Sequence, residues 1–215
     1  MFDFLALAQE CAPAVAPETM AAVVRVESGY RPLAIGVVNG RLARQPASLE
    51  EAVATALALE RDGWNFSLGL AQVNRHNLAR HGLSYRDAFD ACANLRAGSL
   101  ILADCYRRAR ASAADDQAAL QAALSCYYSG NFKTGFRTEG GKPSYVQKVY
   151  AGAGEAPPPI PVVPAPGRAT PAKPPPPAGG PEESPARLRP APSRDDKKDE
   201  STQKDESAGN PAIVF

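Results

Sequence analysis

The sequence lacks the features that mark several large classes of protein. It has two histidines among 215 residues, and its four cysteines follow no zinc-binding spacing, so neither a metal nor an organic cofactor is indicated. No apolar run approaches the ~18 residues that a membrane-spanning helix requires. The 24 basic and 23 acidic residues leave a net charge of +1, which argues against nucleic acid as the main partner.

The N-terminal segment also lacks what a secretory signal needs. Residues 1–8 are apolar but short, they carry no basic residue, and Asp3 stands where lysine or arginine would help. We interpret Asp3 as a helix N-cap and residues 4–11 as a short helix that is stopped at Pro13.

The four cysteines allow two interpretations of nearly equal weight. They fit two disulfides in an oxidising compartment, or four small buried side chains in a reducing one. Cys105 and Cys126 lie on successive expected helices and could approach each other, which would leave Cys11 and Cys92 as the remaining two.

Proline marks a boundary between two parts of the chain. Sixteen of the 21 prolines lie in the last 61 residues. We therefore predict one globular domain over residues 1–152 and a disordered Pro/Ala-rich and charged tail over 153–215, of a composition typical of extended spacers. The tail ends in the apolar residues 212–215, which are either an ordinary terminus or a short docking motif.

Helical signals dominate the predicted domain. A proline at the first helical position and a glycine after the last predict a helix over residues 17–28. Ser48 and Glu51 form a capping-box pattern that predicts a second helix over residues 48–62. Three more helices are expected over residues 91–110, 115–128 and 145–150.

Residues 33–45 depart from this pattern. Two short runs flank Asn39-Gly40, which predicts a β-hairpin. The expected fold is therefore mainly α, an α+β lobe of helices with a small hairpin. The helix over residues 48–62 is expected to bury the apolar stripe Leu49, Val53, Ala56, Leu57 and Leu59.

Glu27 is the most informative residue of the predicted domain. The apolar stripe of the helix over 17–28 runs through Met20, Val23 and Val24, and Glu27 occupies the next position on it. A carboxyl group there would point toward the interior, at a helix end where the dipole disfavours negative charge. Both effects raise a carboxyl pKa, as a general acid near neutral pH requires. The alternative is an exposed or arginine-paired glutamate.

Two further segments place polar side chains among apolar ones. Gly69 would let a backbone approach a ligand closely, and Gln72 and Asn74 carry amides suited to sugar hydroxyl and N-acetyl groups. Tyr127 continues the apolar stripe of its helix, and its hydroxyl, if buried, would need a partner such as a protonated carboxyl. Taken alone, an ordinary turn and a core tyrosine explain these segments more simply.

Together, the three segments resemble the lytic transglycosylases of the goose-type-lysozyme-like fold, in order and in rough spacing. The motifs that carry the resemblance are Glu27-Ser28-Gly29-Tyr30, Gly69-Leu70-Ala71-Gln72-Val73-Asn74 and Tyr127-Tyr128-Ser129-Gly130-Asn131. The similarity covers residues 5–150 and is closer to the VirB-type transglycosylases of type IV secretion systems. The sequence departs from the common pattern at Tyr128, where many relatives have asparagine, and at Ala71, where methionine is common.

The resemblance implies a reaction and a set of site residues. The family cleaves the β-1,4 bond between N-acetylmuramic acid and N-acetylglucosamine in peptidoglycan without water, and releases a 1,6-anhydro sugar. Carried over by motif position, Glu27 is the acid and then the base, and Tyr127 hydrogen-bonds and orients it. Ser28 would hold the helix end and contact glycan. The implied substrate contacts are Ser28, Gly69, Gln72, Asn74, Tyr127 and Asn131.

Partners and location follow from the same resemblance. Peptidoglycan strands are the expected substrate, the periplasm is the expected location, and components of a type IV secretion system are expected partners, through the tail. Two alternatives stay open: a muramidase that uses water, and a peptidoglycan-binding assembly module without catalysis. Ordinary glycosidases need two carboxylates, and only Glu27 lies on a plausible interior face.

Overall fold

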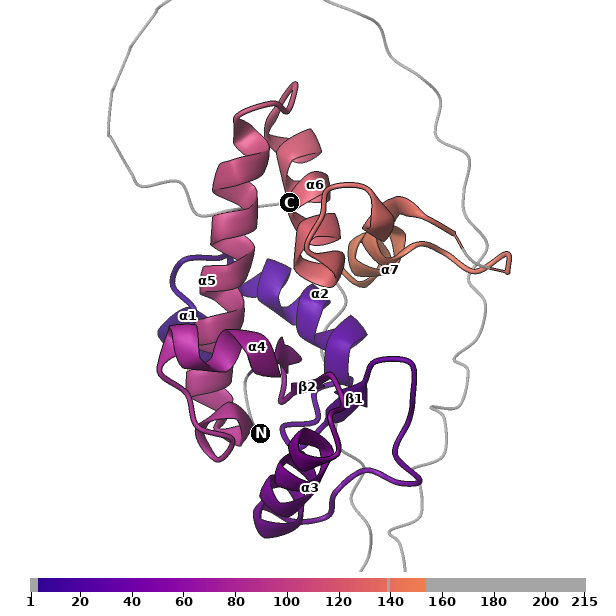
Figure 1. Cartoon of the computed structure of the whole chain (residues 1–215). Helices are drawn as coiled ribbons and strands as arrows, with labels where there is room; N and C mark the ends of the chain where they lie inside the picture. Colours follow the sequence, from indigo (N-terminus) through magenta and orange to yellow (C-terminus); the bar gives the residue numbers. More distant parts are fainter. Residues whose placement is uncertain (1–3, 139, 154–215) are drawn as a thin grey trace, which may run out of the picture. The chain divides into compact units, whose positions relative to one another are not determined.

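A computed structural model describes residues 4–138 and 140–153 (Figure 1). Its α-helices are α1 (Phe4–Cys11), α2 (Pro17–Ser28), α3 (Leu49–Arg61), α4 (Arg75–Leu78), α5 (Ala91–Arg110), α6 (Asp116–Ser129) and α7 (Tyr145–Gly152). Its short 3-10 helices are η1 (Ala79–His81), η2 (Asp87–Phe89) and η3 (Thr134–Phe136). The predicted mainly α fold is confirmed. The predicted cap Asp3 and the tail after Ala153 lie outside the described residues.

Helix α5 is the longest helix, and α6 packs along it (Figure 1). Each of the two helices begins at an aspartate whose side chain accepts a hydrogen bond from a backbone N–H of the first turn, Asp90 for α5 and Asp115 for α6. One face of α5 is buried, including the fully buried Leu95 and Leu102. The two predicted helices are therefore confirmed, with α6 shifted by one residue at each end.

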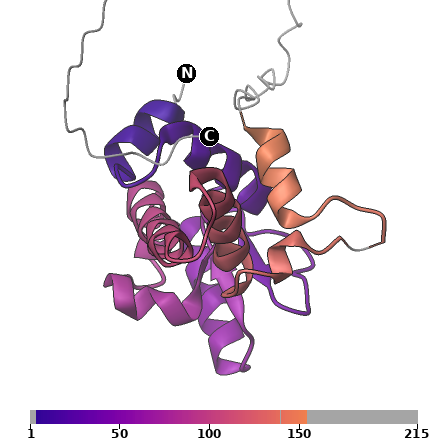
Figure 2. The same cartoon turned by 90° about the horizontal axis from the view of Figure 1, so that it is seen from above.

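Helix α2 lies between α1 and α7, and its predicted boundaries are confirmed. Pro17 stands at its start, and Gly29 ends it in a left-handed conformation, with φ of 58° and its N–H bonded to the carbonyl of Arg25. Seen from above, α7 runs beside α2 on the far side from α5 (Figure 2). This contact brings the C-terminal helix of the domain to the helix that carries Glu27.

The predicted hairpin over residues 33–45 is wrong. Strand β1 (Ile35–Val37) pairs antiparallel with β2 (Phe66–Leu68), and β2 pairs with β3 (Val73–Asn74). The Asn39-Gly40 turn does form, with the N–H of Gly40 bonded to the carbonyl of Val37. The chain after it does not return as a strand, because β2 offers fully buried apolar side chains whereas residues 41–45 are largely exposed.

A single side chain takes the place of the missing strand. The amide of Gln45 accepts a hydrogen bond from the N–H of Ile35 at 2.8 Å and donates one to its carbonyl at 3.0 Å. These are the two bonds that a paired residue of a neighbouring strand would make. Gln45 therefore satisfies the edge of β1 without a second strand.

Helix α3 forms as predicted, and its predicted apolar stripe is confirmed except at Leu57. Ser48 accepts a hydrogen bond from the N–H of Glu51, whereas the Glu51 carboxylate bonds to Ala47 and Arg44 and so leaves the capping box incomplete. The buried residues of α3 are Ala52 and Ala56, and Leu57 is 52% exposed. The helix lies at the periphery (Figure 1), and beside these alanines Leu49, Val53 and Leu59 pack partly buried against the core.

Candidate active site

The end of α2 presents Glu27 to a large cleft. Met20, Val23 and Val24 are fully buried and orient the helix, so that the next position on the same face carries a half-buried carboxyl group at the cleft surface. The prediction that Glu27 follows this apolar stripe is confirmed. Ser28, one residue later, is buried and donates a hydrogen bond to the carbonyl of Val24 at 3.2 Å, which holds the helix end as expected.

Two opposing effects set the acidity of Glu27. Burial removes water from the carboxylate and raises its pKa, while a hydrogen bond from the Tyr145 hydroxyl, at 2.5 Å to Oε1, lowers it. Burial is the larger effect, and the pKa of Glu27 is raised to about 7. A carboxyl with this pKa is protonated in a large fraction of molecules at neutral pH, as a general acid requires.

The tyrosine that contacts Glu27 is Tyr145 on α7, and the predicted hydrogen bond from Tyr127 is wrong. The Tyr127 hydroxyl donates instead to the backbone carbonyl of Ala71, at 2.6 Å. Tyr127 still lines the cleft, and the nearby charge of Glu27 is one of the causes that raise its own pKa, after burial. Tyr128 stacks on Tyr145, with ring centroids 4.6 Å apart.

The turn between β2 and β3 supplies the second part of the site. Gln72 adopts a left-handed conformation, with φ of 47°, and its amide nitrogen donates to the carbonyls of Ala34 and Gly69. The side chain is held across β1 in this way and lines the cleft. A hydrogen bond from the Tyr127 hydroxyl to Ala71 fixes the same turn to α6.

Gly69 has a packing role that the sequence did not indicate. Its φ is 78°, and a Cβ atom there would overlap the Ala88 carbonyl and the side-chain amide of Asn94. Asn94 is fully buried: it accepts from the N–H of Ala71 at 2.7 Å and donates to the carbonyls of Leu68 and Ala88. The bonds to Leu68 and Ala71 fasten the turn to α5, and the bond to Ala88 holds η2 against the same helix.

The cleft has a volume of about 1060 Å³ and collects four of the predicted site residues. Those four are Glu27, Gln72, Asn74 and Tyr127. The described residues that line it do not include Ser28, Gly69 or Asn131. The Asn131 side chain accepts hydrogen bonds from the backbone of Lys133 and Thr134, which orders the loop after α6. A direct substrate contact of these three residues stays a prediction.

Sequence reasoning missed Tyr145 and Asn94. Tyr145 is the first residue of α7, directly after Ser144, whose side chain and Gln147 form a capping box. The cap predicts a helix start but carries no information on which distant side chain meets it. A polar Asn94 among the buried positions of α5 was a usable signal, because a buried amide must find hydrogen-bond partners.

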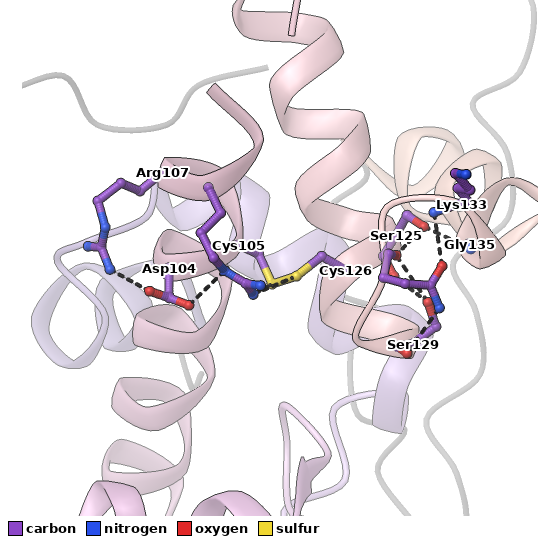
Figure 3. Close-up of a disulfide and its surroundings, with 10 residues drawn as sticks. Asp104, Cys105, Arg107, Ser125, Cys126, Ser129, Lys133 and Gly135 are labelled. Carbon is purple, nitrogen blue, oxygen red and sulfur yellow. Dashed lines mark hydrogen bonds and ion pairs between the residues drawn. A yellow bond between two sulfur atoms is a disulfide. The ribbon is translucent and has the colours of Figure 1, made fainter. Parts of the chain in front are cut away.

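A disulfide lies in the cleft wall beyond Tyr127. Cys105 of α5 is bonded to Cys126 of α6, and Cys11 of α1 is bonded to Cys92 of α5. The interpretation with two disulfides is confirmed. Figure 3 shows the Cys105–Cys126 bridge between the two helices, with the Asp104–Arg107 ion pair beside it. Ser125, on the other side, bonds the carbonyl of Asn131 and the N–H of Gly135.

Residues 4–138 and 140–153 contain no group of three or more His, Cys, Asp or Glu that could hold a metal ion. In the same part of the chain, no helix is long and apolar enough to cross a membrane. The cleft lining includes two carboxylates, Glu27 and Asp104, together with tyrosine hydroxyls, neutral amides and arginines.

A family model described as "Transglycosylase SLT domain" matches residues 4–142. This chain belongs to that family of lytic transglycosylases. The match includes Glu27, Gln72 and Tyr127, and ends before Tyr145.

Known relatives of the chain identify a subgroup within this family. The chain is 62% identical over 165 residues to "Type IV secretion system protein virB1" of Brucella suis biovar 1 (strain 1330), which covers 76% of the chain and 69% of the relative. It is 35% identical over 162 residues to "Protein virB1" of Agrobacterium fabrum (strain C58 / ATCC 33970), covering 74% and 62%. The chain is thus a VirB-type lytic transglycosylase. No solved structure gives a significant match.

Proposed function

We propose that this transglycosylase cleaves the β-1,4 bond between N-acetylmuramic acid and N-acetylglucosamine in peptidoglycan, and leaves a 1,6-anhydro end. The observation that carries the proposal is the Glu27 carboxyl group, which faces the cleft with a pKa of about 7 and a hydrogen bond from Tyr145. Neutral amide side chains line the cleft near it, including Gln72 and Asn74, and such groups suit sugar hydroxyl and N-acetyl groups.

The reaction needs Glu27 in two protonation states. Protonated Glu27 donates its proton to the glycosidic oxygen while the C1–O bond breaks. The muramic 6-hydroxyl then attacks C1, and the Glu27 carboxylate takes the proton of that hydroxyl. The carboxyl group returns to its starting state, and no water is consumed.

The ion pairs of the second carboxylate in the cleft wall, Asp104, support a mechanism in which Glu27 is the one carboxyl group that reacts. Among the described residues that line the cleft, the carboxylates are Glu27 and Asp104. Asp104 is ion-paired with both Arg107 and Arg108, so its two oxygens are engaged by arginine side chains. A hydrolytic glycosidase would need a second free carboxylate beside the scissile bond.

The test is mass spectrometry of the products that the wild type and the variant Glu27→Gln release from purified peptidoglycan. We expect anhydro-muramic ends from the wild type and a loss of rate on the order of 100-fold or more in the variant. Glu50→Gln, which changes an exposed glutamate of α3, is the matched control and should match the wild type.

Two results would contradict this proposal. Reducing ends, heavier by one water, would indicate a muramidase. Glycan binding without products from either protein would indicate an assembly module.

We further propose that the enzyme acts in the periplasm and opens the cell wall for a type IV secretion system. The printed name of the Brucella relative supports the second part, and two disulfides are typical of an oxidising compartment. If catalysis serves secretion, Glu27→Gln should fail to restore secretion in a deletion strain.

Tail partners are a separate proposal: a chain that stops after Ala153 should keep full activity on isolated cell wall but fail to restore secretion.

A further inference from the structure

The cleft that contains Glu27 also has a positively charged part, which the cleavage reaction does not use. Arg80 and His81 of η1 line it together with Arg107 and Arg108 of α5. We call these four residues the cationic wall. The lining also includes neutral polar side chains such as Gln72 and Asn74, so the cleft presents both cationic and neutral polar groups.

The cationic wall keeps an excess of positive charge. Among the described residues that line the cleft, Asp104 is the carboxylate that pairs with the cationic wall. It forms ion pairs with Arg107 and with Arg108, and the Nε atom of Arg108 lies 3.1 Å from Asp104 Oδ2. Three arginines against one aspartate leave two positive charges unbalanced. The pKa of His81 is lowered by burial and by the charge of Arg80, so this histidine too lies in a positive field.

Arg108 is held in place before any ligand arrives. Its Nη2 atom lies 3.3 Å from Cys105 Sγ and 3.0 Å from Cys126 Sγ, and its guanidinium carbon lies 5.7 Å from the centre of the Phe132 ring. Within the described residues, its hydrogen bonds and ion pairs run through Nε and Nη2. Both N–H groups of Nη1 are therefore left for an anion, and the ordering entropy of the side chain is already lost.

The last turn of α6 connects the cationic wall to the reaction centre. Cys126 lies against Arg108, and Tyr128, two residues later, stacks on the tyrosine that bonds Glu27. Arg108, Cys126, Tyr128 and Glu27 line the same cleft, so an anionic group bound at Arg108 would share that cleft with the sugar at the scissile bond.

We propose that the cationic wall binds the carboxylates of the peptide stem that muramic acid residues carry in peptidoglycan. This inference rests on the proposed substrate. A glycan strand is neutral along its sugars, whereas the stems add carboxylates at the muramic positions. Arginine pairs with carboxylates through two parallel N–H···O bonds, and the charge pattern of the cleft matches such a ligand.

The experiment measures binding apart from turnover, in the full chain that carries Glu27→Gln. Dissociation constants are compared for three soluble glycan fragments: one with peptide stems, one with the stem carboxylates amidated, and one with the stems removed and the freed lactyl carboxylates amidated. Arg80→Gln and Arg107→Gln are then added, singly and together. Both side chains are exposed, so the substitutions leave the core intact. Arg61→Gln, on the exposed surface of α3, is the matched control.

We expect the parent protein to bind stem-bearing fragments about tenfold more tightly than amidated or stem-free ones. The double variant should lose most of this preference, Arg61→Gln should keep it, and salt should weaken it. Equal affinity for all three fragments, or a preference that survives the double variant, would overturn the proposal. If the wild type gives no anhydro products but prefers stem-bearing fragments, the proposed reaction is wrong, while the proposed binding of stem carboxylates by the cationic wall is supported.

Discussion

At the scale of the residue, the proposed reaction depends on the pKa of Glu27, which burial and a hydrogen bond shift in opposite directions. Burial disfavours the carboxylate, and the Tyr145 hydroxyl stabilises it. Complete burial without the tyrosine would hold the proton too tightly for the second step, in which the carboxylate must accept one. A pKa of about 7 allows both steps at neutral pH.

The pH profile of cleavage should report this balance. The acid step needs protonated Glu27, so we expect the rate to be level at acidic pH and to fall as pH rises through about 7. Tyr145→Phe removes a hydrogen bond that lowers the pKa, and the fall should move to higher pH. Initial rates of anhydro product formation from pH 5 to 9 give both midpoints.

The control for this profile is Tyr106→Phe. It removes a hydroxyl that donates to Asp116 at 3.2 Å and that does not line the cleft, so its midpoint should equal that of the wild type. A shift of the Tyr145→Phe midpoint to lower pH would contradict our account, because it would mean that the hydroxyl favours the protonated acid.

At the scale of the element, the site depends on the turn between β2 and β3, which a buried side chain of α5 holds in place. The turn from β2 to β3 presents Gln72 to the cleft, and the fully buried Asn94 holds it with bonds to Leu68 and Ala71. This close contact excludes a side chain at Gly69. The glycine of the motif therefore makes room for the protein's own amide, in addition to any ligand it approaches.

Comparing two glycines isolates this packing effect. Gly69 and Gly63 have φ of 78° and 76°, but no described atom lies within 4 Å of a Cβ built on Gly63. Gly63→Ala should therefore lower the free energy of unfolding by about 1 kcal/mol, from backbone strain alone. Gly69→Ala should lower it by about 3 kcal/mol or more, because the added methyl group overlaps Asn94 and Ala88.

Urea unfolding followed by circular dichroism measures both values. Gly69→Ala should also lower the affinity for glycan, since Gln72 moves with the turn. Equal destabilisation by the two variants would show that the contact with Asn94 relaxes freely.

At the scale of the whole molecule, two disulfides tie α1, α5 and α6 together. Cys11–Cys92 closes a separation of 81 residues, and Cys105–Cys126 closes one of 21. The longer separation restricts the unfolded chain more, so its bridge should contribute more to stability in the chain-entropy picture. The shorter bridge lies in the cleft wall and keeps Arg108 in place.

We expect Cys11→Ala/Cys92→Ala to lower the free energy of unfolding by about 4 kcal/mol, and Cys105→Ala/Cys126→Ala by about 3 kcal/mol. Urea unfolding without reductant measures both. Thiol titration of the denatured, non-reduced wild type should find no free thiol. Four free thiols would contradict the bridges described above.

Much of the fold was predictable because its signals are local. Pro17 and Gly29 bound α2, Asp90 caps α5, and each acts within one helical turn. The position of Glu27 on the apolar stripe of α2 follows from helical periodicity, and its proposed role follows from the family motif. The cysteine pairing could only be named as one possibility, because sequence spacing does not show which helices touch.

The amino-acid sequence by itself determined most of the helices and the family, and it placed Glu27 on the face of α2 that meets the cleft. Only the tertiary structure decided that β1 pairs with β2, that Gln45 closes the edge of β1, and that Tyr145 bonds Glu27 across a separation of 118 residues. Periodicity and caps act over a few residues, whereas strand partners and buried hydrogen bonds depend on how complete elements pack. Tyr127 and Tyr145 could therefore be told apart only once α7 was placed against α2.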